Sequence, residues 1–114
     1  MSEIEGIARL RIHPGKLEEF KALQVQCMEI TRTKDTGTLQ YDIFFNDDAS
    51  ECIVHERYRD SDASLEHFAN LGATMTSLFQ VCSGEGEILG RPSAQLRKAL
   101  EGAPVRIFTP YQSL

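Results

Sequence analysis

The chain has 114 residues, and its 17 acidic and 12 basic side chains give a formal net charge of −5. This length predicts a single domain with a two-layer core, and the negative charge argues against binding to nucleic acid or to acidic membrane surfaces. No apolar stretch approaches the roughly 20 residues that span a bilayer. The N-terminal segment also lacks the basic and apolar regions of a signal peptide, so we expect a cytoplasmic protein.

The first half of the chain predicts a strand, a helix and a β-hairpin. Residues 4–13 alternate between apolar and polar side chains, as a strand requires. Pro14 and Gly15 then open a helix to about residue 33, whose apolar stripe consists of Leu17, Phe20, Leu23, Cys27 and Ile30. Residues 38–45 and 50–59 form the hairpin, because they flank a turn-rich Asn-Asp-Asp-Ala segment.

The second half predicts a helix, a strand and a helix–strand extension. Asp60 or Ser61 caps the helix, and a Leu-Gly step at position 72 kinks or splits it. Ser83 and Gly84 are expected to close the helix, and a strand follows at 85–89. Residues 91–114 then add a short helix and a strand at 105–108 to the same domain. The order β-α-β-β-α-β is that of an α+β, ferredoxin-like fold, whose helices cover one face of an antiparallel-rich sheet.

The helix-free face of this sheet is predicted to need a cover. It carries Ile7, Arg9, Arg11 and His13 from the first strand, Gln40, Asp42 and Phe44 from the second, and Ile53, His55, Arg57 and Arg59 from the third. Such a mixture of arginine and apolar residues favours a homodimer interface. The alternative is that the four arginines bind an anion.

The three cysteines, Cys27, Cys52 and Cys82, are odd in number, far apart and at apolar positions. This pattern fits neither a disulfide framework nor a zinc site. We therefore interpret them as buried free thiols and expect no metal site.

The candidate chemistry lies between residues 54 and 68. Strand alternation puts Glu56 on the core face with Val54 and Tyr58. A carboxylate there has to accept hydrogen bonds or carry a proton, because an isolated buried charge costs several kcal/mol. We predict that His67, in the next helix, is its partner and that the two form a coupled acid/base pair. The alternatives are a structural hydrogen-bonding role for Glu56 and a core-edge position for His67.

Three segments of the chain resemble the antibiotic biosynthesis monooxygenase domain family. Residues 12–20 resemble its Pro-Gly-Lys-x-Glu-Glu-Phe helix start, and residues 36–41 its Pro-Gly-Cys-Leu-x-Tyr strand entry, with threonine at positions 36 and 38. Residues 56–67 resemble its Glu-x-Trp and Ala-x-x-x-His signature, with Tyr58 in place of tryptophan. The resemblance implies a dimeric α+β barrel.

The resemblance also implies an activity, because some members oxidise small quinols or hydroxylated aromatics without flavin or metal. Glu56 and His67 would then supply the proton chemistry, and no cofactor would be needed. An apolar wall would exclude water and hold the ring. The candidate substrate-binding residues are Tyr41, Phe45, Tyr58, Phe68, Asn70, Met75 and Phe79, although most of these types at these spacings also suit an ordinary core.

Two alternatives to oxygenation stay open. An isomerase of a small phosphorylated carbonyl compound would use Glu56 and His67 to move a proton, with Lys16 holding the phosphate. A non-catalytic dimeric binding protein would use the same pocket without turnover. Haem degradation, a further activity in the family, is not expected because the chain has no tryptophan.

Overall fold

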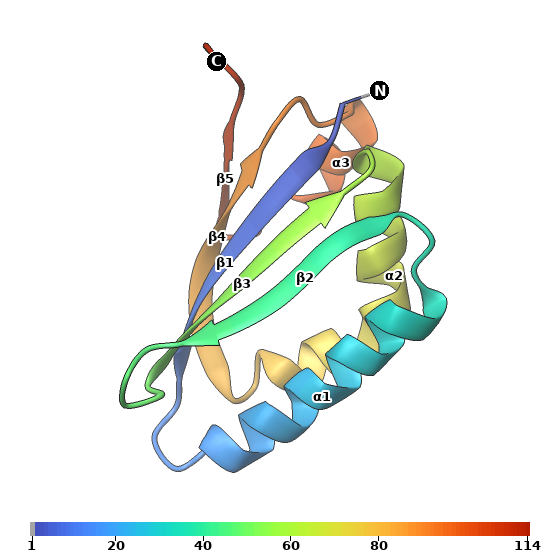
Figure 1. The fold of residues 1–114 in the computed structure, drawn as a ribbon. Coiled ribbons are helices and arrows are strands. Elements are labelled where there is room, and N and C mark those ends of the chain that lie inside the picture. Colours follow the sequence, from blue (N-terminus) through green and yellow to red (C-terminus); the bar gives the residue numbers. More distant parts are fainter. Residues whose placement is uncertain (1) are drawn as a thin grey trace.

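A computed structural model describes residues 2–114 and shows eight secondary-structure elements (Figure 1). In chain order they are β1 (Ile4–Ile12), α1 (Leu17–Lys34), β2 (Thr38–Phe45), β3 (Glu51–Tyr58), α2 (Ser61–Leu78), β4 (Cys82–Leu89), α3 (Ala94–Ala99) and β5 (Val105–Phe108). The first six elements follow the β-α-β-β-α-β order, so the predicted α+β, ferredoxin-like fold is confirmed.

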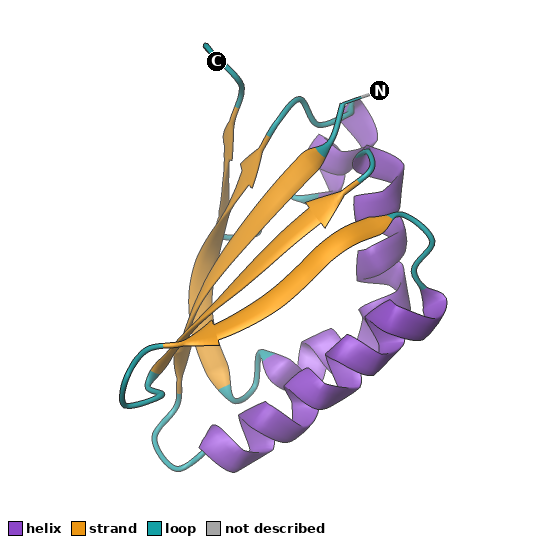
Figure 2. Ribbon diagram, viewed as in Figure 1, coloured by secondary structure: helices purple, strands orange, loops and turns teal. Residues whose placement is uncertain are grey.

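The five strands form one mixed sheet in the order β2-β3-β1-β4-β5. The first four strands pair antiparallel, and β5 adds to β4 in parallel. The long helices α1 and α2 lie against the same face of the sheet, and the opposite face carries no helix (Figure 2). Within residues 2–114, no helix is both long and apolar enough to cross a lipid bilayer.

Local signals place the start of α2 and its internal break as predicted, whereas the helix ends at Leu78 and does not reach Ser83. The side chain of Asp60 accepts a hydrogen bond from the backbone N–H of Ala63 and so caps the helix. Gly72 interrupts the helix with φ 45° and ψ −121°, a conformation that side-chain-bearing residues rarely adopt. The predicted kink is therefore confirmed.

The start of β4 differs from the sequence prediction. The strand begins at Cys82 rather than at residue 85, because Ser83 and Gly84 pair with Arg11 and Leu10 of β1 instead of closing the helix. A Cβ atom at position 84 would come within 2.1 Å of a β1 carbonyl oxygen. Glycine here permits a close strand approach, which is a role that its turn propensity does not reveal.

Two apolar clusters lie between the sheet and the helices. The first consists of Leu10, Phe20, Cys52, Val54, Leu78, Val81 and Cys82. The second consists of Ile4, Tyr58, Ala63, Ile88 and Leu96, and half-buried side chains of β5 pack against it. The three cysteines are buried free thiols, as predicted. The polar residues described next lie beside Tyr58, on the inner side of the sheet.

Candidate functional site

The site begins with a carboxylate on the inner face of β3. Cys52, Val54 and Tyr58 alternate along this strand and are at most 4% exposed, and Glu56 shares their face with a side chain that is 14% exposed. The hydroxyl group of Tyr58 donates a hydrogen bond to Glu56 Oε1. The strand therefore presents a charged side chain to the protein interior and satisfies one of its two oxygens locally.

The second component is His67, which α2 carries back over the sheet. Its side chain is 1% exposed, and its Nε2 atom lies 3.4 Å from Glu56 Oε1. Aromatic rings surround the imidazole, with centroid separations of 5.2 Å for Tyr41, 5.4 Å for Tyr58 and 5.9 Å for Phe68. The predicted acid/base residues thus lie side by side in an apolar enclosure.

The third component is Asp35, which follows the last residue of α1. Its Oδ2 atom lies 2.7 Å from His67 Nδ1 and accepts a hydrogen bond of 2.6 Å from Thr38. Its Oδ1 atom accepts a hydrogen bond of 2.8 Å from the amide of Asn70. Asp35 is 1% exposed through its side chain, so both nitrogen atoms of His67 face a carboxylate.

Sequence reasoning missed Asp35, because an aspartate after a helix reads as an ordinary loop residue. One signal was present. Asp35 occupies the C-cap of α1, where the helix dipole disfavours a negative charge. A carboxylate at this position needs another source of stabilisation, and here three side chains provide it.

The pKa values of the buried groups follow from these contacts. Burial alone lowers the pKa of His67, but the hydrogen bonds and charges of Glu56 and Asp35 outweigh it and raise this pKa above its ordinary value of 6.5. Burial raises the pKa of Asp35, but hydrogen bonds from Asn70, Thr38 and His67 outweigh it and lower this pKa. The site therefore favours an imidazolium ion between two carboxylates.

The phenols of the site stay protonated. Burial, followed by the charge and hydrogen bond of Glu56, raises the pKa of Tyr58 well above its usual value. Burial is also the main cause that raises the pKa of Tyr41. Tyr58 therefore acts as a hydrogen-bond donor to Glu56 and not as a base.

The second oxygen of Glu56 faces the middle of the sheet. A Cβ atom added to Gly6 of β1 would lie 3.7 Å from Glu56 Oε2, and no hydrogen bond within residues 2–114 reaches this oxygen. Ala8, two residues along β1 from Gly6, and Gly86, which pairs with Ala8 on β4, also have small or no side chains and keep some accessible surface. Glu56 Oε2 is thus the one carboxylate oxygen of the site that has no protein partner among the described residues.

The predicted substrate-binding residues separate into two groups. Tyr41, Tyr58, Phe68 and Asn70 surround His67 or its partner Asp35, as described above. The other three take no part in these contacts. Phe45 is 40% exposed against Phe20, Phe79 is 50% exposed beyond the end of α2, and the half-buried Met75 follows the break at position 72.

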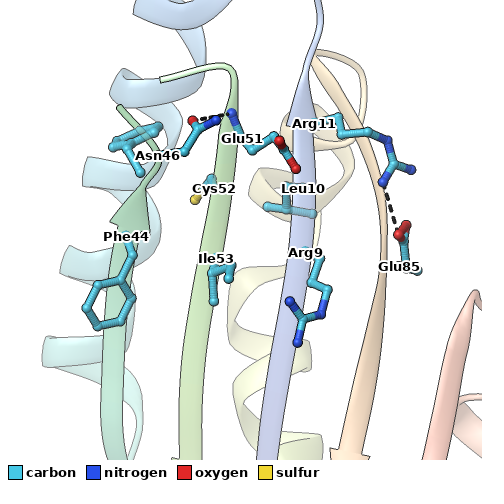
Figure 3. A pocket seen from close by; sticks show the side chains of 10 residues that line it. Arg9, Leu10, Arg11, Phe44, Asn46, Glu51, Cys52, Ile53 and Glu85 are labelled. Atoms are coloured by element: carbon cyan, nitrogen blue, oxygen red, sulfur yellow. Dashed lines mark hydrogen bonds and ion pairs between the residues drawn. The ribbon is translucent and has the colours of Figure 1, made fainter. Parts of the chain in front are cut away.

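A separate pocket of about 310 Å³ lies on the helix-free face, and Figure 3 shows it with the helices behind the sheet. It is lined by Arg9, Leu10, Arg11, Phe44, Phe45, Asn46, Glu51, Cys52, Ile53 and Glu85. Arg11 pairs with Glu85 at 3.0 Å, and Arg9 pairs with Glu87 at 3.3 Å. Because acidic partners neutralise these arginines, the pocket does not favour an anion.

Comparison with known proteins identifies the family of this chain and the solved structures that share its fold. The family model for antibiotic biosynthesis monooxygenases matches residues 4–73, which is more than half of the chain. No curated protein sequence matches significantly. Three solved structures share the fold. MupZ from Pseudomonas fluorescens has 24% identity and a TM-score of 0.87 over 98% of this chain and 93% of its own. Rv0793 from Mycobacterium tuberculosis has 23% identity and a TM-score of 0.70 over 80% of this chain and 96% of its own.

The third structure is SnoaB from Streptomyces nogalater, described as a cofactor-independent oxygenase. It has 16% identity and a TM-score of 0.69 over 82% of this chain and 97% of its own. The coverage by MupZ extends through almost the whole chain, so its fold includes a counterpart of most of residues 91–114. On the strength of the family model, this chain belongs to the antibiotic biosynthesis monooxygenase family.

Proposed function

We propose that the chain is a cofactor-independent, monooxygenase-like enzyme that oxidises a small quinol or hydroxylated aromatic compound. The observation that carries the proposal is the buried imidazole of His67 between two carboxylates, one of which keeps an oxygen free toward the interior. Membership of the family supports it, as does the fold shared with SnoaB, which is described as a cofactor-independent oxygenase.

The first step is removal of a phenolic proton. Glu56 Oε2 accepts the proton, and the imidazolium form of His67 stabilises the negative charge that develops beside it. The aromatic side chains around His67 exclude water, which strengthens both interactions. The resulting phenolate is electron-rich enough to give one electron to dioxygen.

The oxygen chemistry needs no external reductant. One-electron transfer gives superoxide and a substrate radical, which combine at a ring carbon to form a peroxide. Glu56, protonated in the first step, returns its proton to the peroxide and so yields a hydroperoxide. Loss of that carbon's hydrogen as a proton and cleavage of the O–O bond then give a carbonyl group and water. One oxygen atom enters the substrate, and all four electrons come from the substrate.

Asp35 and Tyr58 position the two reacting groups. Asp35 holds His67 Nδ1 at 2.7 Å, which directs Nε2 toward Glu56. Tyr58 occupies Glu56 Oε1, which leaves Oε2 for the substrate. This arrangement gives each carboxylate a different role, because only that of Glu56 keeps an oxygen without a protein partner among the described residues.

The structure favours oxygenation over the isomerase alternative. Lys16 precedes α1, whereas Asp35 follows it. At 1.5 Å per residue, the 18 residues of this helix separate them by about 27 Å. Lys16 is therefore not placed to hold a phosphate group beside His67.

Oxygen uptake tests the proposal. The parent protein is expected to consume oxygen with at least one member of a panel of quinols and hydroxynaphthalenes, with or without a chelator. Glu56→Gln and His67→Ala are expected to lower turnover by about 10²–10⁴-fold, the usual contribution of a positioned acid or base. Asp35→Asn should give a smaller loss, because it removes the charge but keeps a hydrogen-bonding group.

The exposed His13 supplies a matched control, and His13→Ala should keep the parental rate. Full activity of Glu56→Gln and His67→Ala from pH 5 to 9, a range that spans the usual histidine pKa, would remove the proton-transfer role. Ligand binding without oxygen uptake by the parent would instead favour the non-catalytic binding protein.

A further inference from the structure

A buried glutamine on α1 has no hydrogen-bond partner. Gln24 is 5% exposed, and within residues 2–114 neither its Nε2 nor its Oε1 atom has a protein partner. An unpartnered buried amide lowers the stability of a folded protein, and native structures rarely keep one without a reason. The only other buried side-chain atom in this condition among the described residues is the hydroxyl oxygen of Ser64.

Packing does not account for this glutamine. Gln24 belongs to the buried stripe of α1, one turn from Phe20 and one turn from Cys27. The other buried polar residue of this stripe, Thr31, donates its hydroxyl to the carbonyl of Cys27 at 2.8 Å. A methionine would fill a similar volume at position 24 without burying polar atoms, so the amide itself needs an explanation.

The stripe leads from Gln24 to the acid/base site. Burial raises the pKa of the thiol of Cys27, one turn closer to the C-terminal end of α1, and the nearby hydroxyl of Tyr41 opposes this. The ring of Tyr41 lies 5.2 Å from that of His67. Gln24 is thus one helical turn away from a residue that touches the wall of the site, on the same inner side of the helix.

We propose that Gln24 is a substrate-binding residue that holds the part of the substrate remote from Glu56 and His67. The placement of that substrate rests on the proposed function. Because Nε2 offers donors and Oε1 offers an acceptor, the complementary group must both accept and donate. A hydroxyl group satisfies both atoms, whereas a carboxylate leaves Oε1 unpaired. The preferred substrate therefore carries a second hydroxyl group in addition to the one that Glu56 deprotonates.

Anaerobic calorimetry with two related compounds tests this inference, because binding is then measured without turnover. The probes are 1,4-dihydroxynaphthalene and 1-naphthol, which lacks the second hydroxyl. The parent is expected to bind the dihydroxy compound about 10-fold or more tightly, since one satisfied hydrogen bond is worth about that factor. Gln24→Met should abolish this preference.

Thermal unfolding of the free protein gives an independent reading. Gln24→Met should raise the melting temperature, because it removes two unpaired buried polar groups. Gln24→Leu serves as a second variant if methionine fits poorly. Gln26, which is exposed on the same helix, supplies the control, and Gln26→Met should change neither the melting temperature nor the preference.

Two results would overturn the inference. One is a parent protein that does not discriminate between the two compounds, and the other is a Gln24→Met protein that keeps the parental preference. Either result leaves oxygen uptake by the parent intact, so it does not touch the proposed function. Conversely, a Gln24-dependent preference without any oxygen uptake would support this binding role while contradicting the oxygenase proposal.

Discussion

His67 is the residue on which the site depends, because it is buried and has a carboxylate at each ring nitrogen. A neutral imidazole would offer only one N–H to two acceptors, whereas the imidazolium form offers one to each. The surrounding carboxylates therefore raise its pKa despite burial. The charge that assists catalysis in our proposal is thus already present in the resting protein.

This raised pKa predicts a pH-dependent stability. A folded-state pKa above the unfolded value of 6.5 means that the folded protein binds the His67 proton more tightly. The stabilisation is complete below pH 6.5 and is lost as the pH rises through the folded pKa. The parent should therefore lose its stability advantage over His67→Gln as the pH rises from about 6 to 9, a window above the usual histidine pKa.

Urea unfolding at a series of pH values measures this advantage. The lowered pKa of Asp35 has the opposite sign, since its contribution is present above its ordinary value of 3.8 and is lost in acid. The two effects therefore occupy separate pH ranges. A constant difference between parent and His67→Gln from pH 6 to 9 would show that the imidazole is neutral in the folded protein.

At the scale of elements, the sequence predicted those features of the helices and strands that depend only on neighbouring residues. The break at Gly72 and the cap at Asp60 were predictable because glycine conformation and capping depend on neighbouring residues. The start of β4 was not predictable, because the need for glycine at position 84 comes from the close approach of β4 to β1. Asp35 was missed for the same reason, since its partner His67 is 32 residues away in the chain.

The break in α2 is expected to require glycine. Position 72 has φ 45° and ψ −121°, and no atom lies within 4 Å of an added Cβ. Gly72→Ala would therefore meet backbone strain without a steric clash, and we expect it to lower the free energy of unfolding by about 1–3 kcal/mol. Chemical denaturation measures this change.

Thr76→Ala is the matched control for this prediction. Thr76 is exposed on the same helix, and alanine is the better helix former, so the variant should be at least as stable as the parent. An unchanged stability of Gly72→Ala would mean that α2 can run through position 72 without a break. The orientation of Asn70 toward Asp35 would then not depend on the glycine.

At the scale of the whole molecule, the helix-free face of the sheet lacks an apolar cover. Phe44 is 54% exposed and Ile53 is 36% exposed on neighbouring strands. The arginines beside them pair with acidic residues of the same face, namely Glu3, Glu85 and Glu87. A surface with exposed apolar groups and internally neutralised charge suits a second copy of itself better than an anion.

We therefore expect a homodimer joined through the helix-free faces, with a sedimentation mass of twice 12.8 kDa at micromolar concentration. Ile53→Glu should shift this equilibrium toward the monomer, because a twofold interface would place the new charge twice in a buried contact. Val25, which is 69% exposed on α1, is the matched control, and Val25→Glu should stay dimeric because it lies on the helical side. A parent that sediments as a monomer would contradict the dimer and leave the two-layer domain as the functional unit. An Ile53→Glu protein that stays dimeric would place the interface elsewhere.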